Sequence, residues 1–121
     1  MISVLVVDDQ ADLRLLVRSL ITAANDGLEC EMEAESGEAA VACLDEGGAT
    51  VVLLDQMMPG MTGIETAKQI LARVPDQRII LFSAYLDDQL LETARAVGIR
   101  ECLDKGSFGE VVAAVRRVAA A

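Results

Sequence analysis

The sequence contains no histidine and only three cysteines, Cys30, Cys43 and Cys102, in 121 residues. The three thiols are widely spaced, and an odd number of cysteines without histidine argues against both a zinc site and a disulfide framework. We therefore expect all three to be buried thiols in a reducing compartment. Aromatic side chains make up only 2% of the chain while hydrophobic residues make up 53%, so the core has to be aliphatic.

Long apolar runs and an excess of positive charge are also missing. No apolar stretch approaches the roughly 20 residues of a membrane helix, and the N-terminus lacks the basic and apolar pattern of a signal peptide. We expect a cytoplasmic protein with no membrane contact. The formal net charge is −10, and residues 1–60 carry it, with 12 acidic and 2 basic residues. Without a basic stripe, direct nucleic acid binding by this domain is not expected. The acidic half is either a solvated surface or the location of a divalent-cation pocket.

What the chain does contain is a regular alternation of strand and helix patterns. Near-continuous apolar runs predict buried strands, and apolar residues at helical spacing predict amphipathic helices between them. Glutamates alternate with Cys30, Met32 and Ala34 in the second strand, so one side of it is solvated, which predicts that this strand lies at a sheet edge. We predict one α/β domain over residues 1–121, a doubly wound five-stranded parallel sheet of order 2-1-3-4-5 with five helices. The strands are expected over residues 2–7, 29–35, 51–55, 78–83 and 100–103.

The helical stripes make more local predictions. The spacing of apolar residues predicts that Leu16 of the first helix and Val74 of the third are buried. It also predicts that the last helix begins near Phe108. We expect Thr62 to be the N-cap of the third helix, because Glu65 three residues later completes a capping box.

Carboxylates follow the first and third predicted strands. Asp8 and Asp9 end the first, and Asp55 ends the third. In the predicted strand order these two strands flank the crevice where ligands bind. Three carboxylates this close require a counter-ion, for which Mg²⁺ is the natural choice. Ser83 and Lys105 end the fourth and fifth strands and complete a set suited to phosphoryl transfer onto an aspartate.

With these polar residues at the ends of successive strands, the sequence resembles the receiver domain of two-component response regulators over essentially the whole chain. Asp55 stands in the family's pattern of Asp, two residues, Met-Pro, three residues and Gly, here Met58-Pro59 and Gly63. Ser83 is followed by Ala84, and Lys105 matches the family's lysine after the fifth strand.

The resemblance implies a signalling switch that catalyses its own phosphorylation and dephosphorylation but is not otherwise an enzyme. Asp55 would accept a phosphoryl group from the phosphohistidine of a histidine kinase or phosphotransfer protein, since this chain has no histidine to serve as donor. Mg²⁺ would be bound by Asp8, Asp9, Asp55 and the backbone carbonyl of Met57, while Ser83 and Lys105 would contact the phosphoryl oxygens. An output domain or a second copy would contact the face formed by the fourth helix, fifth strand and fifth helix.

Departures from the family pattern raise further expectations. Receivers usually carry Tyr or Phe three residues before the lysine, where this chain has Cys102, so the usual aromatic switch is absent. Tyr85, two residues after Ser83, is the alternative switch candidate, against a plain loop aromatic. Gly106 replaces the common proline, so no cis peptide is expected there. Met57 would shield the phosphoryl group from water and lengthen the life of the phosphoform, while packing of the loop methionines is favoured over a partner groove.

Three rival interpretations remain to be tested. A dehalogenase-like aspartyl phosphatase would need a second acid two residues after its nucleophile, where this chain has Met57. A flavodoxin-like flavin module would need a phosphate loop after the first strand, where this chain has Asp8-Asp9-Gln10. A degenerate receiver would have lost part of the acidic, hydroxyl and lysine set, which is complete here.

Overall fold

The five apolar segments form one parallel sheet in the order β2-β1-β3-β4-β5. This structure is a computed structural model that describes all 121 residues. The predicted doubly wound sheet is confirmed, including the position of the acidic strand at an edge. The strands are β1 (Ile2–Val7), β2 (Leu28–Ala34), β3 (Val51–Asp55), β4 (Arg78–Ser83) and β5 (Glu101–Asp104).

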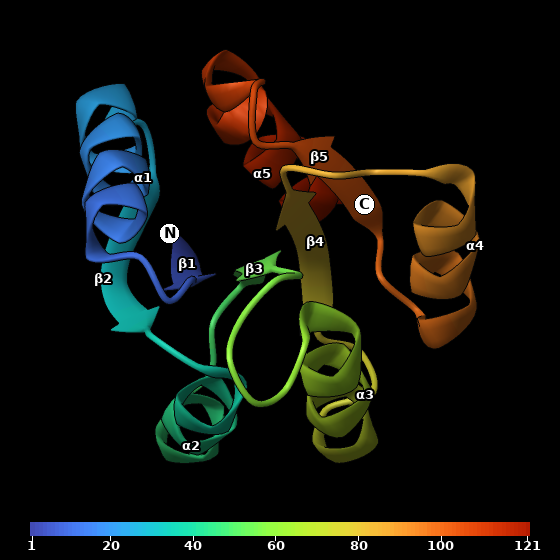
Figure 1. Ribbon diagram of the computed structural model, residues 1–121. Helices are drawn as coiled ribbons and strands as arrows, with labels where there is room; N and C mark the ends of the chain where they lie inside the picture. Colours follow the sequence, from blue (N-terminus) through green and yellow to red (C-terminus); the bar gives the residue numbers. More distant parts are fainter.

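Helices cover both faces of this sheet. Figure 1 shows α1 and α5 on one face, α2 and α3 on the other, and α4 beside β5. None of the helices combines the length and the apolar character needed to cross a membrane. Their bounds are α1 (Ala11–Ala24), α2 (Gly37–Glu46), α3 (Gly63–Arg73), α4 (Asp88–Val97) and α5 (Val111–Ala120), with a short 3₁₀ helix, η1 (Phe108–Glu110), before α5.

Two aliphatic cores lie on the two sides of the sheet, because successive residues of a strand point to opposite faces. Val4, Val6 and Leu53 pack under α1 and α5, whereas Leu5 and Leu54 pack under α2 and α3. The two phenylalanines, Phe82 and Phe108, meet edge to face with ring centroids 5.3 Å apart. The central strands are therefore apolar on both faces, which explains their near-continuous hydrophobic sequences.

The acidic strand β2 pairs with β1 alone and leaves its other edge open. Leu28, Cys30 and Ala34 are buried on it. Glu31 and Glu33, between them, are exposed. Charged side chains on an edge strand discourage pairing with another chain.

Several local predictions from the sequence were wrong. Leu16 is 45% exposed because α1 faces the core through Val17 and Ile21 instead. Val74 is 39% exposed because it caps α3 after its last turn. Cys43 and Cys102 are partly exposed, and only Cys30 is buried. The last helical segment is divided into η1 and α5, and β5 begins one residue later than predicted.

Candidate functional site

Three carboxylates meet at the carboxyl ends of β1 and β3. In the sheet, Val7 pairs with Leu54, so the residues that follow them, Asp8 and Asp55, extend from neighbouring strands at the same level. One carboxylate oxygen from each of Asp8, Asp9 and Asp55 lies within 4.8 Å of the others. Asp8 and Asp55 are buried, whereas Asp9 is exposed at the mouth of this acidic pocket. The convergence predicted from strand order is therefore present.

Lys105 and Ser83 reach the same end of the sheet from β5 and β4. The Lys105 Nζ atom lies 2.9 Å from Asp8 Oδ2 and 3.1 Å from Asp55 Oδ1. The Lys105 backbone N–H also donates to the Ser83 carbonyl at 2.9 Å, which ties the two strand ends together. Ser83 is buried, and its Oγ accepts a hydrogen bond of 3.3 Å from the Tyr85 backbone N–H.

The electrostatics of the pocket are unbalanced. Burial raises the pKa of the Asp55 carboxyl above its usual value, and the nearby charge of Asp8 adds to the rise, although Lys105 opposes it. Burial acts against the charge of Lys105, but its contacts with Asp8 and Asp55 outweigh that effect and raise the pKa of its ammonium group. One fixed cation therefore faces three carboxylates.

This arrangement fits a hard divalent cation. Asp8 Oδ2 is a buried oxygen with no completed hydrogen bond, and the Lys105 ammonium is the cation paired with it. Clustered carboxylate oxygens, one of them exposed, are the donors that Mg²⁺ prefers, since this ion combines a few carboxylates with water and phosphate oxygens. The residues that could hold the ion are Asp8, Asp9 and Asp55.

The loop between β3 and α3 is fixed by hydrogen bonds to the start of α3. The Gly63 N–H donates to the Gln56 carbonyl at 3.0 Å, and the Ile64 N–H donates to Gln56 Oε1 at 2.9 Å. Thr62 and Glu65 form the predicted capping box. Gln56 and Thr62 thus satisfy the free N–H groups of the first helical turn.

Met57 and Tyr85 flank a cleft beside Ser83. The cleft has a volume of about 510 Å³ and lies between the β3–α3 loop and α4, with Ser83, Gln56 and Leu90 also in its wall. The Met57 side chain is 67% exposed, so the prediction that it packs within the loop was wrong, whereas Met58 is buried. Tyr85 is 81% exposed.

Cys102 lies away from this cleft. It lines a separate depression of about 170 Å³ with Leu91 and Arg95 of α4. Of the three switch candidates, Ser83 and Tyr85 therefore share one cavity, and Cys102 does not.

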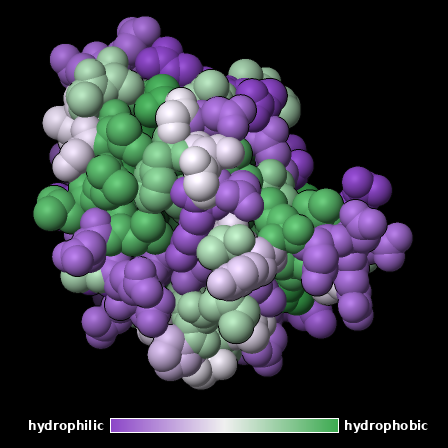
Figure 2. All heavy atoms as spheres, turned by 45° about the horizontal axis from the view of Figure 1, so that its top comes forward, coloured by the Kyte–Doolittle hydropathy of each residue, from purple (hydrophilic) through white to green (hydrophobic).

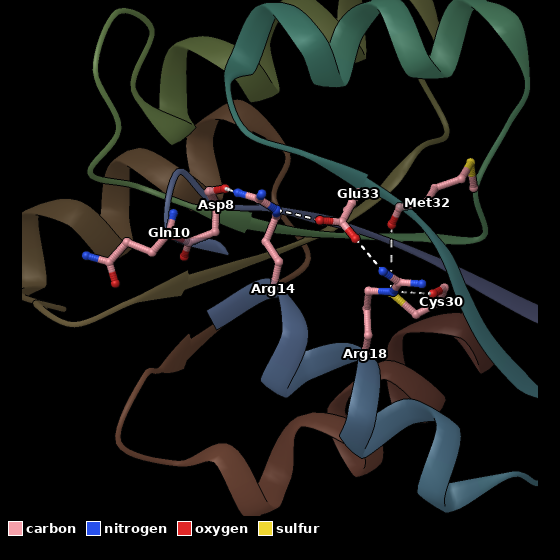
Figure 3. Close-up of polar contacts among 7 residues, drawn as sticks. All are labelled: Asp8, Gln10, Arg14, Arg18, Cys30, Met32 and Glu33. Carbon is pink, nitrogen blue, oxygen red and sulfur yellow. Dashed lines mark hydrogen bonds and ion pairs between the residues drawn. The ribbon is translucent and has the colours of Figure 1, made fainter. Parts of the chain in front are cut away.

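Arg14 contacts the backbone of the acidic pocket, and the sequence did not predict this. Figure 3 shows its guanidinium between Asp8 and Glu33, with Nη1 donating to the Asp8 carbonyl at 2.7 Å and Nε donating to Glu33 Oε1 at 2.7 Å. One feature of the sequence could have pointed to it: Arg14 and Arg18 are the only basic residues among the first 60.

The fold and the pocket define a doubly wound domain with a cluster of three carboxylates in the crevice between β1 and β3. The profile of the response regulator receiver domain matches residues 4–116. This chain belongs to that family. Receiver domains are signalling switches of two-component systems, and phosphorylation of an aspartate and use of Mg²⁺ are general features of the family. This membership favours the receiver interpretation over the phosphatase and the flavin module.

Individual proteins support the same membership. The chain is 34% identical over 119 residues to the response regulator UvrY of Escherichia coli, which covers 98% of this chain and 54% of UvrY. It is 31% identical to the chemotaxis protein CheY of Listeria monocytogenes over 87% of both chains. The structure of the response regulator protein TrrA of Thermotoga maritima, in complex with Mg²⁺ and a beryllium fluoride, has 32% identity and a TM-score of 0.85, covering 98% of this chain and 99% of TrrA.

The fraction of each relative's length that this chain spans differs between the relatives. The chain spans about half the length of the first curated regulators that it matches, 58% and 54% for the first two.

Proposed function

We propose that Asp55 is the phosphoacceptor of this receiver domain. The observation that carries the proposal is the position of its carboxylate: buried at the end of β3, with Oδ1 3.1 Å from the Lys105 ammonium and within one acidic pocket with Asp8 and Asp9. A nucleophile for phosphoryl transfer has to be held in line with its target while nearby cations offset the charge of the phosphoryl oxygens. Asp55 is the member of the pocket closest in sequence to the fixed β3–α3 loop.

The reaction would consist of one displacement at phosphorus. A carboxylate oxygen of Asp55 forms a bond to phosphorus as the P–N bond of a phosphohistidine breaks. The electron pair of the P–N bond leaves with the imidazole ring, which takes up a proton from water. Because burial and Asp8 raise the pKa of Asp55, its charge is poorly stabilised before the reaction, which favours conversion of the carboxylate into an acyl phosphate whose acyl oxygen carries no charge.

Lys105 and Ser83 would contact the product. The Lys105 ammonium already lies between Asp8 and Asp55, so it can exchange its contact with the Asp55 carboxylate for one with a phosphoryl oxygen. The Ser83 hydroxyl, now paired with the backbone of Tyr85, can turn to donate to a phosphoryl oxygen. Mg²⁺, when bound by Asp8, Asp9, Asp55 and the Met57 carbonyl, would supply charge neutralisation at the phosphoryl oxygens.

The partners follow from the family. Response regulators act with histidine kinases, and some carry DNA-binding output domains. For this chain we propose a cytoplasmic location, a histidine kinase or phosphotransfer protein as the donor, and residues 1–121 as one receiver domain. We propose that an output domain or a second copy contacts the face formed by α4, β5 and α5, and that this domain contacts neither nucleic acid nor membrane.

The test is phosphorylation by a small donor. The chain is incubated with Mg²⁺ and either acetyl phosphate or phosphoramidate, and its intact mass is measured. We expect a gain of about 80 Da in the wild-type chain, no gain in Asp55→Asn, and a normal gain in the matched control Asp76→Asn, whose carboxylate is exposed on the loop before β4. A gain that persists in Asp55→Asn would refute the assignment.

A further inference from the structure

Arg14 connects the acidic pocket to the edge strand of the sheet. Its side chain is only 13% exposed. As Figure 3 shows, the guanidinium contacts the backbone carbonyl of Asp8 on one side and the Glu33 carboxylate of β2 on the other. The planar guanidinium presents its donors in a rigid fork, so both contacts fix one orientation of the group.

The carbonyl that Arg14 contacts belongs to the peptide between Asp8 and Asp9. The N–H of Asp8 donates to the Ala34 carbonyl at 3.0 Å, so Asp8 is held on both sides of its Cα atom by the β2 side of the molecule. Beyond that peptide, the Gln10 N–H donates to Asp8 Oδ1 at 2.9 Å. Rotation of the Asp8–Asp9 peptide moves the Asp9 side chain that follows it. It also moves the Gln10 N–H, whose hydrogen bond holds the Asp8 carboxylate.

Arg18, one helical turn later, provides a natural comparison. It contacts the other oxygen of Glu33 at 2.6 Å and the Cys30 carbonyl at 3.3 Å, but it has no contact with Asp8. Its side chain is 44% exposed. The two arginines therefore share a carboxylate, a helix and a charge, and they differ in the contact with the pocket. Their hydrogen bonds, that of Arg14 first, also lower the pKa of Glu33, which keeps this anchor ionised.

We propose that Arg14 is a positioning residue for the cation site: it fixes the Asp8–Asp9 peptide so that both carboxylates face Asp55. The inference rests on the proposed function, since it assigns a role toward the Mg²⁺ site. Partners that orient the ligands of a metal without touching it commonly change its affinity by 10-fold to 100-fold when removed.

The alternative roles of Arg14 predict different changes in Mg²⁺ affinity when the arginine is removed. If Arg14 acted only as a nearby positive charge, its removal would reduce repulsion and tighten Mg²⁺ binding. If it acted only by joining α1 to β2, loss of Arg18 would have a similar effect, because both arginines contact Glu33. Only positioning predicts weaker Mg²⁺ binding upon loss of Arg14 and not upon loss of Arg18.

The experiment compares Arg14→Met with Arg18→Met, which change the net charge equally. Mg²⁺ alone is titrated into each folded variant and its dissociation constant is measured by calorimetry. We expect at least a 10-fold weaker affinity in Arg14→Met and an unchanged or slightly tighter one in Arg18→Met. Equal effects in the two variants, or tighter binding in Arg14→Met, would overturn the inference.

A second measurement works without metal. The Gln10 amide, which is bonded to Asp8, should lose protection from hydrogen exchange in Arg14→Met and keep it in Arg18→Met. Unchanged protection in Arg14→Met would contradict positioning. If the wild-type chain itself bound no Mg²⁺, the proposed function would fail, while the exchange result would still report on Arg14. If Arg14→Met does not fold, Arg14→Lys and Arg18→Lys replace the pair, because lysine keeps the charge but lacks the fork.

Discussion

The Tyr85 backbone N–H is bonded to Ser83 Oγ across 3.3 Å, so the only tyrosine of the chain is attached to the hydroxyl at the end of β4. If Ser83 turns toward a phosphoryl group, this bond breaks and the segment that carries Tyr85 is released. Its ring is 81% exposed and lines the 510 Å³ cleft that could receive it. The chain contains no tryptophan, so tyrosine fluorescence reports on this one side chain.

We therefore expect Mg²⁺ with beryllofluoride, a phosphoryl mimic, to reduce quenching of Tyr85 fluorescence by iodide. Ser83→Ala should lose the response while retaining Mg²⁺ binding. A wild-type chain whose quenching is identical with and without the mimic would exclude Tyr85 as the switch.

Asp55→Asn should stabilise the metal-free chain. The folded-state pKa of Asp55 lies above the unfolded value of about 3.9. The wild-type chain therefore loses stability as the pH rises through the folded-state pKa, since the ionised form is the unfavourable one. At pH 7 we expect the variant to unfold a few degrees higher, and the difference should disappear below about pH 3.5.

Thermal unfolding followed by circular dichroism measures this difference. Saturating Mg²⁺ should stabilise the wild-type chain more than the variant. The exposed control Asp76→Asn should change stability by no more than about 0.5 kcal/mol. A variant that unfolds below the wild type at pH 7 without metal would contradict the electrostatic account of the pocket.

Met57→Gln should shorten the life of the phosphoform. Met57 is 67% exposed beside the cleft at Ser83, so its thioether can cover the phosphoryl group, whereas an amide of similar length can hold a water molecule there. We expect dephosphorylation several times faster, measured by the decay of the mass gain after the donor is removed. Complete loss of phosphate from the wild-type chain within seconds would refute the shielding role.

Gly63→Ala should disrupt the β3–α3 turn. A Cβ atom at Gly63 would overlap the Asp55 carbonyl oxygen and lie 2.9 Å from the Gln56 Cα atom, and both are backbone atoms that cannot move alone. We expect a loss of more than about 3 kcal/mol in the free energy of unfolding, measured by urea denaturation. Gly47→Ala is the control, because a Cβ there meets nothing within 4 Å. Equal stability of the two variants would show that the turn can relax.

The strand order and the pocket could be predicted because their signals are local. Asp8, Asp9 and Asp55 each follow an apolar run, and parallel strands bring such ends together whatever the side-chain details. Thr62 and Glu65 were predictable for a similar reason, since a capping box involves residues three apart.

The remaining features depend on contacts between distant parts of the chain. The exposure of Leu16 on α1 and of Cys102 on β5 depends on which other elements pack against them, which the spacing of apolar residues does not encode. Arg14 acts through Glu33, 19 residues away, and through a backbone carbonyl that no side-chain pattern marks. Gln56 accepts a hydrogen bond from the first turn of α3 although it lies several residues before the N-cap, and N-cap patterns in a sequence do not include such residues.

The glutamates along β2 have a consequence for the behaviour of the protein at high concentration. The open edge of this strand would otherwise offer a second copy a row of unpaired peptide groups. Repulsion between the acidic rows of two copies opposes such sheet extension at low ionic strength, and salt weakens that repulsion. Self-association of this domain through β2 should therefore be rare in dilute buffer, which leaves contacts between copies to other surfaces, such as the face formed by α4, β5 and α5.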